Sequence, residues 1–125
     1  MIQNMLYMEI IKKNRELKKS LTGKIYHISV LSNLVPSQLN DLLEYALREE
    51  AIPAVVQAGD YDNIVQDSLK YSECNLVIVM LDICNIVDGL HYKIELFSDV
   101  EYETVFQKVK FEIDLLLKNL KVWFE

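Results

Sequence analysis

Three short apolar runs that end in polar residues constrain the fold of this chain more than any other feature. They are rich in β-branched and aliphatic residues, a pattern typical of strands buried on both faces in a parallel sheet. The runs and their polar tips are Ile25–Leu31 before Ser32-Asn33, Ala54–Val56 before Gly59-Asp60, and Leu76–Leu81 before Asp82-Ile83-Cys84-Asn85. Ligands of such sheets bind beyond the carboxyl ends of the strands, so these tips predict where a site lies.

Helical patterns separate the three runs. Residues 39–47 carry an amphipathic stripe, and Glu44 and Arg48 fall on the opposite, polar side of that helix. The helix is expected to open at Pro36-Ser37. Further helices are predicted over residues 2–19, 60–69 and 101–120, and residues 84–99 form a long connection without clear periodicity.

The order of these elements predicts an α/β fold of the three-layer, doubly wound, flavodoxin-like type with a mainly parallel sheet. Residues 1–22 form a preceding helix and residues 23–125 the α/β domain. Residues 121–125, Lys-Val-Trp-Phe-Glu, are rich in β-formers and are interpreted as the start of a fourth strand, at which the sheet is truncated. In a sheet of order 2-1-3-4, the first and third strands are neighbours.

Charge argues against a nucleic-acid partner. The chain has 19 acidic against 13 basic residues and a formal net charge of −6, whereas nucleic-acid affinity rests on Lys and Arg neutralising phosphates. The early bases are interpreted as a solvated helix face; they are Lys12, Lys13, Arg15, Lys18 and Lys19. No Gly-rich phosphate loop and no His/Cys metal spacing occurs, so neither a cofactor nor a metal is expected.

The two cysteines indicate a reducing compartment. Cys74 and Cys84 lie at opposite ends of one predicted strand, beyond disulfide reach. The first residues carry no secretory signal, and no apolar run approaches the roughly 20 residues of a membrane span. We therefore expect a soluble, cytoplasmic protein without a membrane partner.

Two of the polar tips offer groups with catalytic potential. Ser32 precedes a helix, where free N–H groups can stabilise an oxyanion beside a nucleophile. The simpler interpretation is that Ser32 or Asn33 satisfies backbone donors in the strand-to-helix turn. At the third tip Asp82 offers a carboxylate, and Asn85 offers an amide that would reach Ser32 if the two strands are adjacent.

The same residues carry a family resemblance. The segments 28–33, 59–67 and 75–82 (ISVLSN, GDYDNIVQD and NLVIVMLD) resemble the N-terminal half of FkbH-like proteins, and the likeness extends from about Lys24 onward. Those proteins join an SGNH-hydrolase-like α/β domain to a HAD-superfamily domain. They act in making or loading glyceryl-type units on acyl carrier proteins, in polyketide and surface-polysaccharide pathways. The resemblance implies that residues 23–125 are an incomplete SGNH-like domain.

The resemblance also assigns roles at the tips. SGNH hydrolases use a Ser nucleophile, Gly and Asn oxyanion donors, and a base from a late Asp-x-x-His; Ser32, Gly59 and Asn85 match the first three. Ser32 lacks the preceding Gly-Asp, and the chain ends before the late Asp-x-x-His block is expected. Of the two histidines, His27 is expected to be packed within the first strand. His91 is then the remaining candidate for the base, although nothing in its spacing requires that role. Esterase activity is therefore not expected.

A phosphatase interpretation of residues 60–64, Asp-Tyr-Asp-Asn-Ile, is rejected because the carboxylates do not directly follow the strand and Ile64 replaces Thr or Val. Helix capping explains these acids more simply. Three functions remain. The first is a non-catalytic module that binds an acyl carrier protein or a HAD-type domain near Asn33, Asp60 and Asp82. The others are an ester hydrolase using Ser32 and a homo-oligomer formed through an apolar sheet edge.

Overall fold

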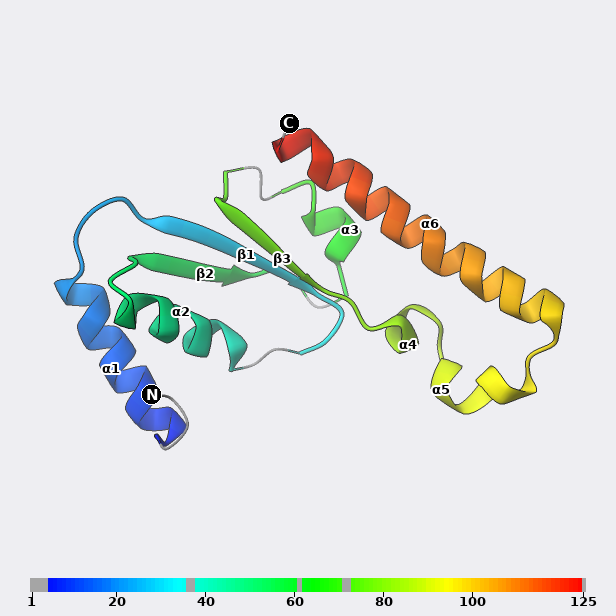
Figure 1. Cartoon of the computed structure of the whole chain (residues 1–125), viewed down its shortest axis with the longest axis horizontal. Helices are drawn as coiled ribbons and strands as arrows, with labels where there is room; N and C mark the ends of the chain where they lie inside the picture. The colour runs from blue at the N-terminus through cyan, green and yellow to red at the C-terminus, as the bar shows by residue number, and fades with distance from the viewer. Residues whose placement is uncertain (1–4, 36–37, 61, 71–72, 125) are drawn as a thin grey trace.

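Three parallel strands form the centre of the computed structural model, which describes residues 5–35, 38–60, 62–70 and 73–124 (Figure 1). β1 (Tyr26–Ser32) lies in the middle, with β2 (Ala54–Ala58) on one side and β3 (Leu76–Met80) on the other. Both neighbours run parallel to β1, so the three apolar runs are the strands of one sheet, as predicted.

Helices cover both faces of this sheet (Figure 1). α1 (Tyr7–Ser20) and α2 (Leu39–Glu49) lie on one side, and α3 (Ile64–Asp67) and α6 (Asp99–Phe124) lie on the other. The chain passes from β1 through α2 to β2, then through α3 across β1 to β3. The fold is therefore doubly wound α/β, which confirms the predicted class.

Each face has its own apolar core. Ile28, Val30, Ala54 and Val56 pack under α2, whereas Leu31, Ile64 and Leu116 pack between the sheet, α3 and α6. Alternate residues of β1 supply both cores because successive side chains of a strand point to opposite faces. Full burial of one Ile, Leu or Val side chain contributes about 1.5–3 kcal/mol. Burial on both faces thus holds a sheet of only three strands.

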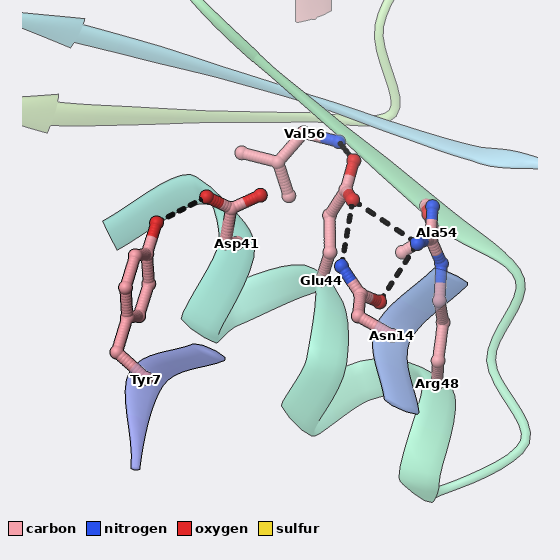
Figure 2. A network of polar contacts seen from close by, with 7 residues as sticks. All are labelled: Tyr7, Asn14, Asp41, Glu44, Arg48, Ala54 and Val56. Atoms are coloured by element: carbon pink, nitrogen blue, oxygen red, sulfur yellow. Dashed lines mark hydrogen bonds and ion pairs between the residues drawn. The ribbon is translucent and has the colours of Figure 1, made fainter. Parts of the chain in front are cut away.

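A buried polar network joins α1 to α2 and β2 (Figure 2). The Arg48 side chain is 3% exposed, and its Nε and Nη2 donate to the carbonyl of Ala54 at 3.1 and 2.8 Å. Its Nη1 donates to Asn14 Oδ1 at 2.7 Å and lies 3.1 Å from Glu44 Oε2. Glu44 also accepts from Asn14 Nδ2 at 3.2 Å and from the Val56 N–H at 2.9 Å.

Glu44 and Arg48 lie on the polar side of α2, as predicted, but the network buries that side instead of leaving it in solvent. The amphipathic stripe of α2 was identified correctly, because Leu39, Leu43 and Leu47 pack on the sheet. The opposite side is covered by α1, whose Tyr7 hydroxyl also donates to Asp41 at 2.6 Å (Figure 2). A helix pattern shows which side is apolar, but not that a second helix buries the polar side.

α3 is shorter than the helix predicted over residues 60–69. At its start Asp62 has a φ of +53°, a left-handed conformation that a helix cannot include. At its end the Ser68 hydroxyl donates to the Val65 carbonyl at 2.5 Å, and the Leu69 N–H donates to Gln66 O in a tighter turn. Local side-chain and turn bonds therefore limit α3 to a single turn.

The predicted fourth strand does not form, because α6 continues as a helix to Phe124. The β-propensity of residues 121–124 reflects how well their side chains fit a pleated, half-buried surface, and an established helix extends at low cost. The connection after β3 is also more structured than expected. It contains α4 (Ile83–Ile86), α5 (Leu90–Lys93) and the 3-10 turn η2 (Ile94–Leu96).

The structure also tests several smaller expectations. Neither Cys74 nor Cys84 forms a disulfide, as predicted, and the five early bases are exposed on α1. The helix start predicted at residues 36–37, and residues 2–4 of the predicted helix 2–19, lie outside the described residues. No helix in the described ranges is both long and apolar enough to cross a membrane.

Candidate functional site

An open crevice lies at the carboxyl ends of β1 and β3, where the sequence predicts a site. Its volume is about 360 Å³. The chain leaves β1 toward α2 on one face and leaves β3 toward α6 on the other, and doubly wound proteins bind ligands at this kind of switch point. The lining residues are Asn33, Asp62, Ile64, Val65, Gln66, Leu81, Asn85, Ile86, Lys108, Glu112, Leu115 and Leu116.

Asn33 ties the two strand tips together at the floor of this crevice. Its Nδ2 donates to the Asp82 carbonyl at 2.8 Å, and its Oδ1 accepts from the Asp82 N–H at 2.7 Å. Asn85 Nδ2 donates to the Asn33 carbonyl at 2.8 Å. Residues 32–33 and 82–85 therefore emerge side by side, as the predicted strand order requires. Asn33 is 1% exposed, so its amide is committed to the fold.

Ser32 lies beside this tie and is itself buried. Its side chain is 5% exposed, and its Oγ accepts from the Leu34 N–H at 2.9 Å. This is the turn-stabilising role that the sequence left as the simpler interpretation. Ser32 is not among the residues that line the crevice. A nucleophilic role would require this turn to open first.

The matching oxyanion donors are also occupied. The Gly59 N–H donates to the Val30 carbonyl at 2.9 Å, which continues the β1–β2 ladder. The Asn85 amide is held by Asn33, as described above. The structure therefore brings Ser32 and Asn85 to neighbouring tips, while each group that the hydrolase hypothesis needs has a partner within the fold.

The Asp60 backbone binds a buried carboxylate that the sequence reasoning missed. Asp67 is 1% exposed, and its Oδ2 accepts from the Asp60 N–H at 2.7 Å. Its Oδ1 accepts from Asn63 Nδ2 at 3.0 Å and lies 3.0 Å from Lys70 Nζ. The Asp60 side chain is exposed and lies 4.0 Å from the same ammonium group. Asp67 thus holds the turn between β2 and α3.

Two opposing effects act on the Asp67 carboxyl. Burial favours the neutral form and raises its pKa, but Lys70, the Asp60 N–H and Asn63 all stabilise the anion, and the net result is a lowered pKa. Gly59 lies next to the Asp67 carboxylate, and a larger residue would not fit there without a shift. A Cβ at position 59 would lie 2.7 Å from Asp67 Oδ2. The i, i+4, i+7 spacing of Asn63, Asp67 and Lys70 is a sequence signal for this cluster, because residues three and four apart are neighbours on a helix.

The remaining predicted residues lie apart from the crevice. The Asp82 carboxylate accepts from the Cys84 N–H at 2.9 Å and caps α4. His91 is exposed in α5 against the Tyr92 ring and does not line the crevice. The expectation that His27 is packed is wrong: its side chain is exposed, because the single turn of α3 leaves that part of the sheet uncovered.

The crevice itself is built from groups that the sequence reasoning did not select. Lys108 and Glu112 come from α6, and Asp62 and Gln66 come from the α3 region. Lys108 and Glu112 reach the strand tips because Leu116 packs α6 on the sheet core and Asn119 bonds it to α3. Among the described residues, no Ser, Thr, Cys or His lines the crevice, and no three potential metal ligands converge. The crevice thus combines polar and charged side chains with the buried apolar Ile64 and Leu116.

Comparison with known proteins adds no relative. No family model matches this chain, and no curated protein or solved structure gives a significant match.

Proposed function

We propose that this chain is a non-catalytic α/β binding module that holds a partner at the crevice between β1 and β3. The observation that carries the proposal is a contrast at the strand tips. Ser32, Gly59 and Asn85 each make a bond within the fold, whereas a crevice of about 360 Å³ beside them remains open. Of these three catalytic candidates, Asn85 lines the crevice, and its amide already donates to the Asn33 carbonyl. Binding groups such as Lys108 and Gln66 also line it.

The crevice supports recognition of a polar surface or a short polar segment. Lys108 and Glu112 provide both signs of charge on one side of the cavity, and Gln66 provides an amide on the other. Ile64, Leu81 and Leu116 supply an apolar floor. A mixed cavity of this kind is typical of binding sites in which a few polar groups fix the orientation of a ligand.

The family resemblance proposes two partners, an acyl carrier protein and a HAD-type catalytic domain, acting in the cytoplasm in polyketide or surface-polysaccharide biosynthesis. Both are proteins, so the crevice would take a projecting side chain or a short loop. The alternative expectation, a homo-oligomer through a sheet edge, concerns a different surface and does not compete for the crevice.

Binding of the immobilised full chain to each purified partner tests the proposal. Gln66→Trp places an indole in the crevice and should weaken binding at least about tenfold. The matched control is Gln107→Trp, an exposed glutamine of α6 that does not line the crevice. Absence of binding to both partners, or equal loss in the two variants, would contradict the proposal.

The hydrolase alternative is tested with p-nitrophenyl acetate. We expect no turnover above the buffer rate, because Ser32 is buried in its turn and no histidine lines the crevice. Turnover that disappears in Ser32→Ala would replace the binding proposal with an esterase. Turnover that survives in Ser32→Ala would exclude Ser32 as the nucleophile.

A further inference from the structure

The two edges of the sheet differ in how they are protected. At β2 the outward-facing carbonyl of Ala54 accepts two bonds from Arg48, and the outward-facing N–H of Val56 donates to Glu44 at 2.9 Å (Figure 2). These groups face outward because Pro53 O and the Gly59 N–H pair with β1. Side chains of α2 therefore occupy the hydrogen-bonding groups of this edge.

The outer edge of β3 has no such cover. Within the described residues, no strand lies beyond β3. The Asn33 N–H donates to Met80 O, and the register pairs Leu76 with Ile28, so Leu76, Ile78 and Met80 direct their backbone groups toward β1. The alternate residues Val77 and Val79 direct theirs away from β1. Residues 76–80 contain no charge, proline or glycine, the usual means by which proteins protect an edge strand. Leu76 is also 40% exposed.

A second apolar surface lies on α6 next to this edge. Phe106, Val109, Ile113 and Leu117, here called the α6 stripe, recur every three or four residues along the helix. Phe106 is 59% and Leu117 is 58% exposed. The first three line a shallow groove of about 230 Å³. The α6 stripe is thus an apolar helix side without a partner among the described residues.

The rotation of α6 places the stripe on the open side of the sheet. Asn119 bonds to α3, and Leu116 packs in the core with the inner side of β3. At about 100° per residue, the Leu116 side chain points between those of Asn119 and Leu117 when the helix is viewed down its axis. Asn119 lies about 60° to one side of Leu116, and Leu117 lies about 100° to the other side. Because α3 packs against β1, the α6 stripe lies on the side of α6 away from α3 and toward the outer edge of β3.

The charges of α6 favour an antiparallel copy of itself as the neighbour. Its first two turns carry Asp99, Glu101 and Glu103, and its last two turns carry Lys118 and Lys121. An antiparallel α6 brings opposite charges together at both ends, whereas a parallel one brings like charges together.

We propose that two copies of this chain join through the outer edges of β3 to form one continuous six-stranded sheet, with α6 packed against α6 of the second copy. A two-fold axis perpendicular to the sheet makes the two β3 strands antiparallel, keeps the helices on the same face and makes the two α6 helices antiparallel. One symmetry operation thus satisfies the backbone edge, the apolar stripe and the charges of α6 together. This dimer leaves the crevice unused and does not depend on the proposed function.

Sedimentation of the full chain between about 1 and 100 μM tests the proposal, and a dimer is expected. Each substitution enters the interface twice, so Leu76→Lys and Leu117→Glu should each raise the dimer dissociation constant at least about tenfold. The matched control for Leu76→Lys is Ile52→Lys. Ile52 lies next to β2, and its exposed fraction of 39% equals that of Leu76, 40%, to within a per cent. The control for Leu117 is Phe111→Glu, 66% exposed on another side of α6. Both controls should remain dimers.

Hydrogen exchange of the wild-type chain gives a second readout that no variant can confound. The backbone amides of Val77 and Val79, which face away from β1, should exchange more slowly as concentration rises, since pairing occupies them. A monomer throughout the range, which would mean that something else covers this side, would overturn the proposal. A dimer that resists Leu76→Lys and Leu117→Glu, is broken equally by the controls, or leaves exchange at residues 76–80 unchanged with concentration would overturn it too.

Discussion

Replacing Arg48 with methionine should destabilise the protein by about 3 kcal/mol. The Arg48 guanidinium is 3% exposed and makes bonds to the Ala54 carbonyl, Asn14 and Glu44. Methionine fills much of the same space but leaves these groups without their donor. Removing one member of a buried ion pair typically costs about 3–5 kcal/mol. The lower end applies here because Glu44 is 17% exposed and water can reach its carboxylate.

A loss of this size is a large part of the total, since a domain of this length is stable by about 5–15 kcal/mol. Glu44→Gln should cost less, about 1–2 kcal/mol, because the amide oxygen still accepts from Val56 while the charge is lost. In the double variant Arg48→Met with Glu44→Gln, no buried anion is left unpaired. Its loss should therefore be at least about 1 kcal/mol smaller than the sum of the two single losses.

Urea unfolding followed by circular dichroism measures these differences, with the m-value checked for constancy. Arg15→Met is the matched control, because Arg15 is exposed on α1, and it should change stability by no more than about 0.5 kcal/mol. The reasoning is refuted if Arg48→Met costs no more than this control, or if the double variant loses the full sum of the single variants.

Three further predictions concern the strand tips. Gly59→Ala should destabilise the fold by about 1–3 kcal/mol in urea unfolding, since its Cβ would lie 2.7 Å from Asp67 Oδ2; a neutral effect would mean that the turn yields freely. Asn33→Ala should cost about 2–4 kcal/mol by the same assay, because two bonds to the Asp82 backbone are lost in a buried site, and a loss below about 1 kcal/mol would show that the tips stay together without it. The lowered pKa of Asp67 contributes stability that is fully present above the unfolded-state pKa near ~4 and is lost as pH falls through the lower folded-state pKa. Asp67→Asn should therefore flatten stability against pH in acid, and an unchanged slope would count against the assignment.

The fold class follows from local patterns. The apolar runs became the strands of one sheet, with β1 buried on both faces and β2 and β3 partly buried, and the helical stripes between them have the period of an amphipathic helix. These patterns depend only on residues close together in the chain, so they identify parallel strands and the side of α2 that meets the sheet. The neighbouring positions of β1 and β3 follow from the doubly wound topology.

Features that depend on distant segments were missed or misjudged. Arg48 and Glu44 look like surface residues of α2, and only the docking of α1 makes them the core of a buried network. Residues 121–124 have strand-like composition, but they extend α6 as a helix over the opposite side of the sheet from α2. In the first case the docking of a distant helix buries side chains that the local pattern places on a polar side. In the second, extension of an established helix outweighs a local preference of a few tenths of a kcal/mol per residue.

By itself, the sequence determined the parallel sheet, its helical layers and the meeting of two polar tips at one rim, because hydrophobic period and strand order dictate these. Only the tertiary structure decided what the tips do. It turned Asn33 inward as a tie between strands, made Asp67 the anchor of a neighbouring turn, and brought Lys108 and Glu112 over the crevice from a helix far along the chain. Whether a polar side chain is free to bind depends on which distant backbone groups lie within hydrogen-bond reach, and spacing along the chain does not contain that information.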